Sequence, residues 1–247
     1  MTKPGNFPQR SIAVIGLGMA AAPHAKSLQE LQHRVTVKAA YSRTVNTRKA
    51  FTEQYGFPSV SDPSDILHDD AISAVLLLSP PNARLEWVQN LCRSGKHILM
   101  EKPLERTLRE ATVITESCRN AGITTGVVFQ NRFRDGAVRL RQRIREGALG
   151  ELHTVQVCVP WWREQSYYDE PLRGSYSRDG GGVLISQAIH TLDLMLQLVG
   201  PVTEVAAIAG TTAAHSMESE DFVGAGLRFA NGAMGSLHAT TDSFQAI

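Results

Sequence analysis

The chain has 247 residues, of which 43% are hydrophobic and 20% are charged, and its formal net charge is +1. This composition is typical of a globular protein and excludes a largely disordered chain. The scattered basic residues offer no continuous surface for a nucleic acid backbone. Three widely spaced cysteines, Cys92, Cys118 and Cys158, argue against a disulfide framework and against a zinc site, so we expect no metal.

Hydropathy bears on where the protein works. The sequence contains no run of about 18 apolar residues, and residues 1–10 include no apolar leader segment. We therefore expect a cytoplasmic protein that has neither a membrane nor a nucleic acid as its partner.

Short β-branched runs alternate with stretches of helical periodicity as far as residue 129. Such alternation predicts right-handed βαβ units, which build a parallel sheet with helices on both faces. The uninterrupted apolar strands agree, because a parallel sheet is covered on both sides. We expect strands at 12–16, 35–41, 74–79, 97–100 and 123–129, and helices at 20–32, 45–55, 83–93 and 108–120.

The pattern changes after residue 129. Strand-like runs separated by turn signals indicate an open, mostly antiparallel sheet, so this part is predicted to be an α+β domain. We expect helices at 136–146 and 183–194, strands at 151–159, 202–209, 221–229 and 233–240, and a polar, aromatic loop that ends near residue 179.

The first predicted strand leads into the sequence GLGMAA at 16–21, which opens the first helix. Gly16, Gly18 and Ala21 occupy the three positions of the dinucleotide-binding motif G-x-G-x-x-G/A, and Met19 lies between them. Gly16 permits a tight turn, Gly18 lets a pyrophosphate approach the backbone, and the helix N-terminus favours the phosphate charge. The alternative is a glycine-lined turn without a ligand.

Because this motif lies inside a complete βαβ unit, we predict a dinucleotide-binding Rossmann domain over 1–129. Residues 130–247 are then expected to form a substrate-binding and dimerisation domain. The expected fold class is α/β, with an N-terminal Rossmann parallel sheet and a second α+β domain built on the open sheet.

The end of the second strand indicates which dinucleotide is bound. An acidic residue there would accept hydrogen bonds from the ribose 2′-hydroxyl of NAD. The sequence has Ser42 and Arg43 instead, a hydroxyl and a guanidinium that suit a 2′-phosphate, so NADP is favoured over NAD. The alternative is that Arg43 only stacks on the adenine and accepts either cofactor.

Two further residues are suited to chemistry. Lys102 follows the strand 97–100 at the carboxyl edge of the sheet, where ligands of such folds bind and where a lysine can exchange a proton with a hydroxyl. Taken alone, a surface lysine is the better interpretation. His190 lies on the helix after the glycine triplet 180–182, where a buried structural histidine is the alternative.

Five segments, taken in order, point to a known family: AVIGLGMAA, LLLSPPNARLEWV, GKHILMEKPLERT, NRFRDGAVRLRQRIREGALGELHTVQV and GGGVLISQAIHTLDLMLQLVGPVTEV. In these segments the chain resembles the Gfo/Idh/MocA oxidoreductases, the glucose-fructose oxidoreductase and inositol dehydrogenase group, over nearly its whole length. The EKP sequence at 101–103 is highly specific in this context.

The resemblance implies roles for individual residues. Lys102 would transfer the proton, and His190 would assist it near the reacting carbinol. The cofactor would be lined by Ser79, Pro80, Pro81, Asn82, Glu101 and Gln130. Substrate would be bound in the loop 161–182 and on the helix that follows, by Arg163, Tyr168, Arg173, Ser186 and Asp193.

The sequence departs from the family pattern at several positions. Ser186 stands where Asp or Asn is usual, and a hydroxyl cannot take the proton or hold the charge of a carboxylate. Arg84 stands where His is frequent, and Leu172 where one subgroup often has Trp. The chain also ends at Ile247, before several strands and a closing helix that family members commonly have, so we expect an incomplete second domain with an exposed strand edge.

We therefore expect an NADP-dependent oxidoreductase that transfers a hydride between nicotinamide and a secondary alcohol of a sugar, cyclitol or polyol. One alternative keeps the fold but reduces the cofactor only transiently, in a non-redox reaction such as glycoside cleavage. Another is a catalytically idle NAD(P)-binding regulatory protein. The second-domain sheet is expected to form the face of a homo-oligomer.

Four polar residues in the second half are given no functional role. His215 and His238 are expected at ordinary surface or sheet positions. Glu220 and Asp221 precede a predicted strand and are expected only to solvate its start.

Overall fold

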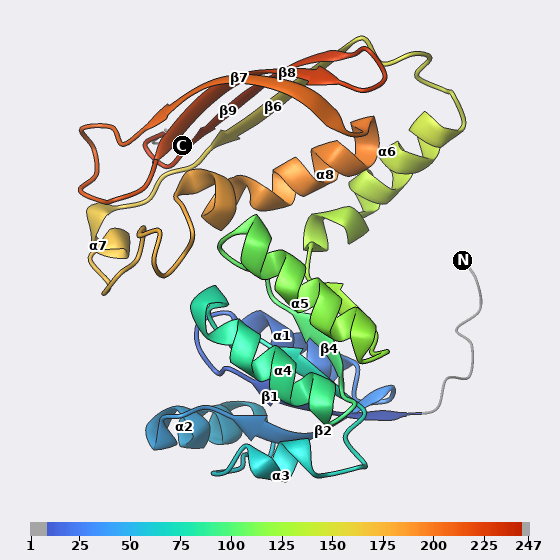
Figure 1. The fold of residues 1–247 in the computed structure, drawn as a ribbon, viewed down its shortest axis with the longest axis vertical. Coiled ribbons are helices and arrows are strands. Elements are labelled where there is room, and N and C mark those ends of the chain that lie inside the picture. Colours follow the sequence, from blue (N-terminus) through green and yellow to red (C-terminus); the bar gives the residue numbers. More distant parts are fainter. Residues whose placement is uncertain (1–8, 244–247) are drawn as a thin grey trace. The chain divides into compact units, whose positions relative to one another are not determined.

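The structure is a computed structural model of the chain, and it describes residues 9–243. Residues 1–8, which make up most of the segment searched for a leader, and residues 244–247 lie outside the described part. The chain divides into two compact units between Val128 and Phe129 (Figure 1). Within 9–243, no helix combines the length and the apolar character that a membrane crossing requires.

The first unit is built on a five-stranded sheet with the order β2-β1-β3-β4-β5. All neighbouring strands are parallel, which confirms the predicted sheet. The strands are β1 (Arg10–Ile15), β2 (Val35–Tyr41), β3 (Ala74–Leu77), β4 (His97–Met100) and β5 (Thr125–Val127).

Helices cover both faces of this sheet. Successive residues of β1 point to opposite faces, so Val14 belongs to the core beneath α1 and α2, whereas Ala13 and Ile15 belong to the core beneath α3, α4 and α5. The helices are α1 (Ala21–Glu30), α2 (Val45–Tyr55), α3 (Ser64–Leu67), α4 (Arg84–Arg93) and α5 (Leu108–Asn120), with a 3₁₀ turn at Pro81–Ala83.

The second unit contains a four-stranded sheet with the order β6-β9-β8-β7. β6 runs parallel to β9, and the other two pairs are antiparallel, which confirms the expected open, mostly antiparallel sheet. The strands are β6 (Thr154–Pro160), β7 (Val202–Gly210), β8 (Phe222–Phe229) and β9 (Met234–Thr240).

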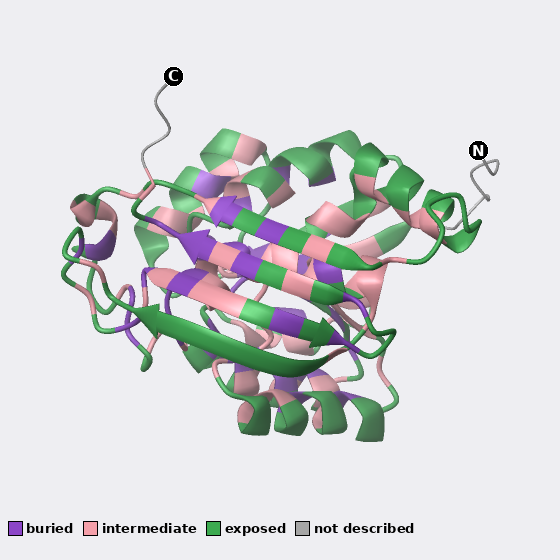
Figure 2. Ribbon diagram, turned by 90° about the horizontal axis from the view of Figure 1, so that it is seen from above, coloured by how far each residue is buried: buried purple, intermediate pink, exposed green. Residues whose placement is uncertain are grey.

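The core of the second unit lies between the sheet and one helix. Met195 of α8 (Ile189–Val199) is buried together with inward residues of the sheet such as Val157, Val223 and Leu237. The outer strand β7 is exposed along almost its whole length (Figure 2). The remaining elements are a 3₁₀ turn at Gln130–Phe133, α6 (Asp135–Arg145), α7 (Gln165–Tyr168) and a π-helical turn at Leu184–Ala188 that runs into α8.

Some short elements were not predicted. α3 and α7 have four residues each, which is too few for a helical period to show in the sequence. The π-helical turn before α8 was expected to be ordinary α-helix. Such turns inside α-helices occur frequently at functional sites.

Candidate functional site

The glycine-rich turn between β1 and α1 packs against the end of β3. Gly16 has a φ of +96°, and its N–H donates to the carbonyl oxygen of Tyr41 at 2.9 Å. A Cβ at Gly16 would lie 2.7 Å from both the carbonyl carbon of Leu78 and the nitrogen of Ser79. Only glycine therefore fits, because any side chain would collide with the backbone of Leu78 and Ser79.

Gly18 has the opposite surroundings. A Cβ there would meet no protein atom within 4 Å, and Gly18 with Met19 also lines an open pocket of about 410 Å³ beside α2. Ala20, just before α1, provides no side-chain cap, so the helix N-terminus retains its capacity to bind an anion. Ala21 is buried in the core. The open space at Gly18 thus fits a phosphate group that approaches the backbone.

The loop after β2 is held by an arginine that the sequence analysis missed. The guanidinium of Arg48, in the first turn of α2, donates to the carbonyl oxygens of Ser42 at 2.5 Å and Arg43 at 3.2 Å. The side chain of Arg43 is exposed. The loop therefore has a defined backbone from which the Arg43 guanidinium extends into solvent.

A buried hydroxyl lies just after β3. Ser79 is buried, and its Oγ has no hydrogen-bond partner among the described residues. An unsatisfied buried polar group costs roughly 1–3 kcal/mol, so a bound group that bonds to it would be stabilised. Pro80 and Asn82 are exposed next to it. The segment after β3 thus combines an accessible surface with an unsatisfied donor.

Glu101 connects α1 to the segment that carries Lys102. The carboxylate of Glu101 lies 2.7 Å from Nε2 of His24 and accepts from the backbone N–H of Lys102 at 2.9 Å. Burial raises the pKa of Glu101, but the hydrogen bonds with His24 and Lys102 outweigh it and hold the pKa below its usual value. Glu101 is therefore an ionised anchor, and the role of His24 was not foreseen.

These features of the first unit meet at one edge of its sheet. β1, β3 and β4 are neighbours, and the glycine-rich turn, Ser79 and Lys102 each follow one of them. The carboxyl ends of parallel strands lie at the same edge, which is where ligands of such sheets bind. Lys102 itself is half-buried there.

In the second unit, the glycine triplet before α8 has a structural reason. A Cβ at Gly182 would lie 1.7 Å from the carbonyl oxygen of Glu220. The Glu220 carboxylate accepts from the N–H groups of Gly182 at 2.9 Å and Leu184 at 3.2 Å. Glu220 therefore caps the helical segment that leads to His190, and the expectation that it only solvates a strand is wrong.

His190 lies at the start of α8 beside a group of charged and aromatic residues. Its ring and the Phe129 ring are arranged edge to face, with 6.1 Å between the ring centres. Asp193, one turn later, is bound by the Arg132 guanidinium, with Nε at 2.6 Å, and this guanidinium also lies over Phe129 at 5.5 Å. Asp193 is thus held in an ion pair. Gln130 is exposed at the first position of the 3₁₀ turn that also contains Arg132.

Ser186 lies in the π-helical turn that precedes α8. Its hydroxyl lies against the carbonyl oxygen of Gly182 at 2.5 Å and against Oε1 of Gln187. Bonds of this kind to a carbonyl one turn back are common for serine in helices. The hydroxyl is therefore bonded within its own helix.

Two of the expected substrate-binding residues contact the same aromatic ring in the loop after β6. The guanidinium of Arg163 lies over Trp161 at 5.1 Å and over Tyr167 at 5.3 Å. Arg173 lies over the same Tyr167 ring at 4.4 Å and also pairs with Glu170. Cation–π contacts of this kind hold both guanidinium groups near one surface.

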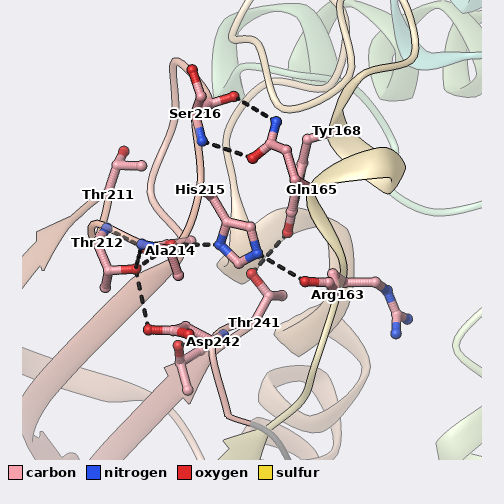
Figure 3. Close-up of polar contacts among 12 residues, drawn as sticks. Arg163, Gln165, Tyr168, Thr211, Thr212, Ala214, His215, Ser216, Thr241 and Asp242 are labelled. Atoms are coloured by element: carbon pink, nitrogen blue, oxygen red, sulfur yellow. Dashed lines mark hydrogen bonds and ion pairs between the residues drawn. The ribbon is translucent and has the colours of Figure 1, made fainter.

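A fully buried ion pair fastens this loop to the sheet (Figure 3). Nδ1 of His215 lies 2.7 Å from the Asp221 carboxylate, and its Nε2 lies 2.8 Å from the carbonyl oxygen of Arg163. Both ring nitrogens therefore lie within hydrogen-bond distance of an oxygen. Burial raises the pKa of Asp221, but bonds from Thr212 and His215 outweigh it, so the pKa lies below its usual value.

The expectations for His215 and Asp221 are wrong, because both side chains are buried and paired with each other inside the second unit. Tyr168 packs on the His215 ring, and its hydroxyl lies 2.8 Å from Oγ1 of Thr241 just beyond β9. Burial raises the pKa of Tyr168.

His238 lies on β9, as expected. Residues 9–243 contain no cluster of three or more His, Cys, Asp or Glu side chains placed to hold a metal ion.

The fold and the glycine-rich turn define a dinucleotide-binding protein with a second sheet unit. A family model described as an oxidoreductase family with an NAD-binding Rossmann fold matches residues 10–129. The model of the GFO/IDH/MocA C-terminal domain matches residues 137–246. The chain therefore belongs to the GFO/IDH/MocA oxidoreductase family, and its first unit is an NAD-binding Rossmann domain.

Three named proteins illustrate what the chain is similar to. The myo-inositol 2-dehydrogenase of Thermotoga maritima is 26% identical over 91% of this chain and 66% of its own length. The levoglucosan dehydrogenase of Pseudarthrobacter phenanthrenivorans is 27% identical over 77% of this chain and 55% of its own length. The solved WlbA dehydrogenase of Bordetella pertussis, in complex with NADH and UDP-GlcNAcA, is 30% identical, with a TM-score of 0.88 over 96% of this chain and 68% of that one. The chain thus spans only about two thirds of the length of its curated relatives.

Gly16 and Gly18 provide a matched pair of substitutions. Gly16→Ala should lower the free energy of unfolding by at least about 2 kcal/mol, because the new Cβ meets backbone atoms at a positive φ. Gly18→Ala should change it by less than about 1 kcal/mol, yet abolish the stabilisation that a bound nicotinamide dinucleotide gives. Urea unfolding with and without the dinucleotide measures both effects. Undiminished dinucleotide stabilisation of Gly18→Ala would contradict the assignment of a phosphate to this space.

The buried ion pair predicts a dependence of stability on pH. Asp221→Asn should lower the free energy of unfolding at pH 7 by roughly 3 kcal/mol, because the buried His215 side chain loses its carboxylate partner. The folded-state pKa of Asp221 is lowered, so its contribution is present above the unfolded pKa of about 4 and is lost as the pH falls further.

The difference between wild type and Asp221→Asn should accordingly shrink when urea unfolding is repeated near pH 3. Asp242→Asn is the control, since Asp242 is exposed and its carboxylate accepts from the Thr212 hydroxyl at 3.3 Å. A difference that stays constant across this pH range would argue against an ionised Asp221 in the folded state.

Proposed function

We propose that the protein is an NADP-dependent oxidoreductase that acts on a secondary alcohol of a sugar, cyclitol or related polyol. The observation that carries the proposal is Lys102, which stands after Glu101 at the sheet edge that also bears the glycine-rich turn and the unsatisfied Ser79 hydroxyl. Relatives named as inositol and levoglucosan dehydrogenases support the substrate class.

The residues present fit a nicotinamide dinucleotide. The open space at Gly18 suits the pyrophosphate, and the Ser79 Oγ offers a hydrogen bond near the end of β3. When bound, the nicotinamide supplies the hydride chemistry of the reaction. The residues that would hold the dinucleotide are Gly16, Gly18, Met19, Ala21, Ser42, Arg43, Ser79, Pro80, Asn82, Glu101 and Gln130.

Lys102 is the proposed proton-transfer residue. Its ammonium group would exchange a proton with the substrate hydroxyl, which is the task of a general acid and base. Glu101 supports this role by holding the Lys102 backbone, because its carboxylate is already bonded and ionised. His190 would assist the proton transfer.

Substrate binding is assigned to the second unit. Arg163 and Arg173 would donate to substrate oxygens from the shared Tyr167 surface, and the ion pair of His215 would keep the Arg163 backbone in place. Tyr168, Ser186 and Asp193 would act mainly by shaping this surface, since the hydroxyls and the carboxylate are bonded within the protein.

The net chemistry separates the proposal from its alternatives. Incubation with NADP and a panel of polyols should accumulate NADPH, measured at 340 nm. Substrate conversion without NADPH accumulation would indicate a cofactor that is reduced only transiently, as in glycoside cleavage. Binding of NADP without any conversion would indicate a regulatory protein.

Lys102→Ala should lower turnover by at least ~100-fold, the lower end for loss of a general acid–base residue. NADP should still raise the melting temperature of the variant, because Lys102 is not among the residues assigned to hold the dinucleotide. Lys26→Ala, an exposed lysine on α1, serves as the control. Near-normal turnover of Lys102→Ala would remove the lysine from the mechanism.

Arg43→Ala tests the preference for NADP. Loss of a charge-assisted bond to a 2′-phosphate should weaken NADP binding by about 10-fold or more and leave NAD binding nearly unchanged. Calorimetric titration with each dinucleotide measures the two affinities. An equal loss for both would mean that Arg43 stacks on the adenine instead.

A further inference from the structure

Arg84 is a buried cation at the base of the proposed catalytic edge. It is the first residue of α4 and is only 1% exposed. Burial lowers the pKa of its guanidinium to about 10, while the negative charges of Glu101 and Glu105 oppose that shift. The group therefore remains charged at neutral pH inside the core.

The Arg84 guanidinium is bonded to the backbone on both sides of Lys102. Nη1 donates to the carbonyl oxygens of Glu101 at 2.7 Å and Leu104 at 3.2 Å, and also to that of Pro103. Three carbonyl groups within four consecutive residues thus converge on one nitrogen. The backbone path through Lys102 is set by these contacts together with the N–H bond to Glu101.

The same guanidinium reaches the segment after β3. Its Nη2 donates to the carbonyl oxygen of Ser79 at 2.6 Å. Ser79 carries the unsatisfied hydroxyl assigned to the dinucleotide, so one side chain joins the proposed dinucleotide-lining segment to the lysine segment. A planar fork of five donors can bridge several carbonyls in a fixed geometry, which a lysine ammonium cannot do.

Packing alone does not explain a charge at this position. Replacing a buried charged group by an apolar residue of similar volume is often neutral or even stabilising, because desolvation of a charge costs several kcal/mol. The four contacts with backbone carbonyl groups do explain the charge, because only a donor group can bind them. They hold the segment after β3 and the segment 101–104 in fixed positions relative to each other, at the sheet edge that carries Lys102.

We infer that Arg84 is a positioning residue for Lys102: it fixes the lysine segment 101–104 against Ser79 and so places the ammonium group for proton transfer. This inference rests on the proposed function for its kinetic consequence. Its structural part, the clamping of segment 101–104, stands without that function. A displacement of about 1 Å at a reacting group can reduce turnover about 100-fold, so a clamp of this kind has a measurable kinetic effect.

The first test measures the clamp directly. Arg84→Met keeps most of the side-chain volume and removes the donors. Hydrogen exchange followed by mass spectrometry should show at least ~10-fold faster exchange of the amides of Lys102, Leu104 and Glu105, with unchanged exchange in β1; a tenfold change corresponds to about 1.4 kcal/mol in opening free energy. Ile66→Ala, which removes core volume from α3, is the control for general destabilisation and should leave 101–105 as in the wild type.

The second test is a double-mutant cycle with the lysine. Arg84→Met should lower turnover about 100-fold in the wild-type background but less than about 3-fold in the Lys102→Ala background, because positioning has no value once the ammonium group is gone. Arg84→Lys should recover only part of the rate, since it keeps the charge and loses the fork.

The two tests separate the possible failures. Equal losses of turnover in both backgrounds would overturn a role through Lys102, and unchanged exchange at 101–105 in Arg84→Met would overturn the clamp itself. If the wild-type protein turns over no polyol, the proposed function fails, and the exchange measurement still decides whether Arg84 clamps the segment.

Discussion

The candidate site depends on one constraint, the absence of a side chain at Gly16. Without a Cβ, the turn after β1 lies directly against the backbone of Leu78 and Ser79 at the end of β3. Two charged groups complete the arrangement. Glu101 ties α1 to the Lys102 backbone through His24, and Arg84 ties the Lys102 segment to Ser79. The ends of three neighbouring strands are thereby linked to one another, and open space lies beside Gly18.

In the second unit, polar and charged side chains likewise hold loops in place by binding backbone groups. Glu220 accepts from the first N–H groups of the helix that leads to His190, and His215 donates to the carbonyl oxygen of Arg163 while it pairs with Asp221. Burying such groups is costly unless their hydrogen-bonding capacity is met within the protein. Here the bonds are made between segments that are distant in sequence, so each side chain links two such segments.

Much of the fold follows from local patterns in the sequence. β2, α2, β4 and α5 have the predicted bounds, because each combines a clear period with a clear end signal, such as the αL glycine at Gly56 after α2. The glycine-rich turn and the lysine after β4 were identified in the same way. The misjudged residues share a different property. His215, Glu220 and Asp221 are polar residues in a turn-rich stretch, and His215 and Glu220 are bonded to Arg163 and Gly182, which lie tens of residues away. Nothing in the neighbouring sequence marks such a pairing.

Arg84 also has a consequence for how sequences of this family can vary. A histidine at this position has at most two N–H donors, so it leaves at least two of the four carbonyl groups for other partners or for water. Exchange between arginine and histidine at position 84 should therefore be accompanied by changes around Ser79 and Leu104. In an alignment these positions would covary, and the lineage of this chain could be traced by that correlated set rather than by its catalytic lysine.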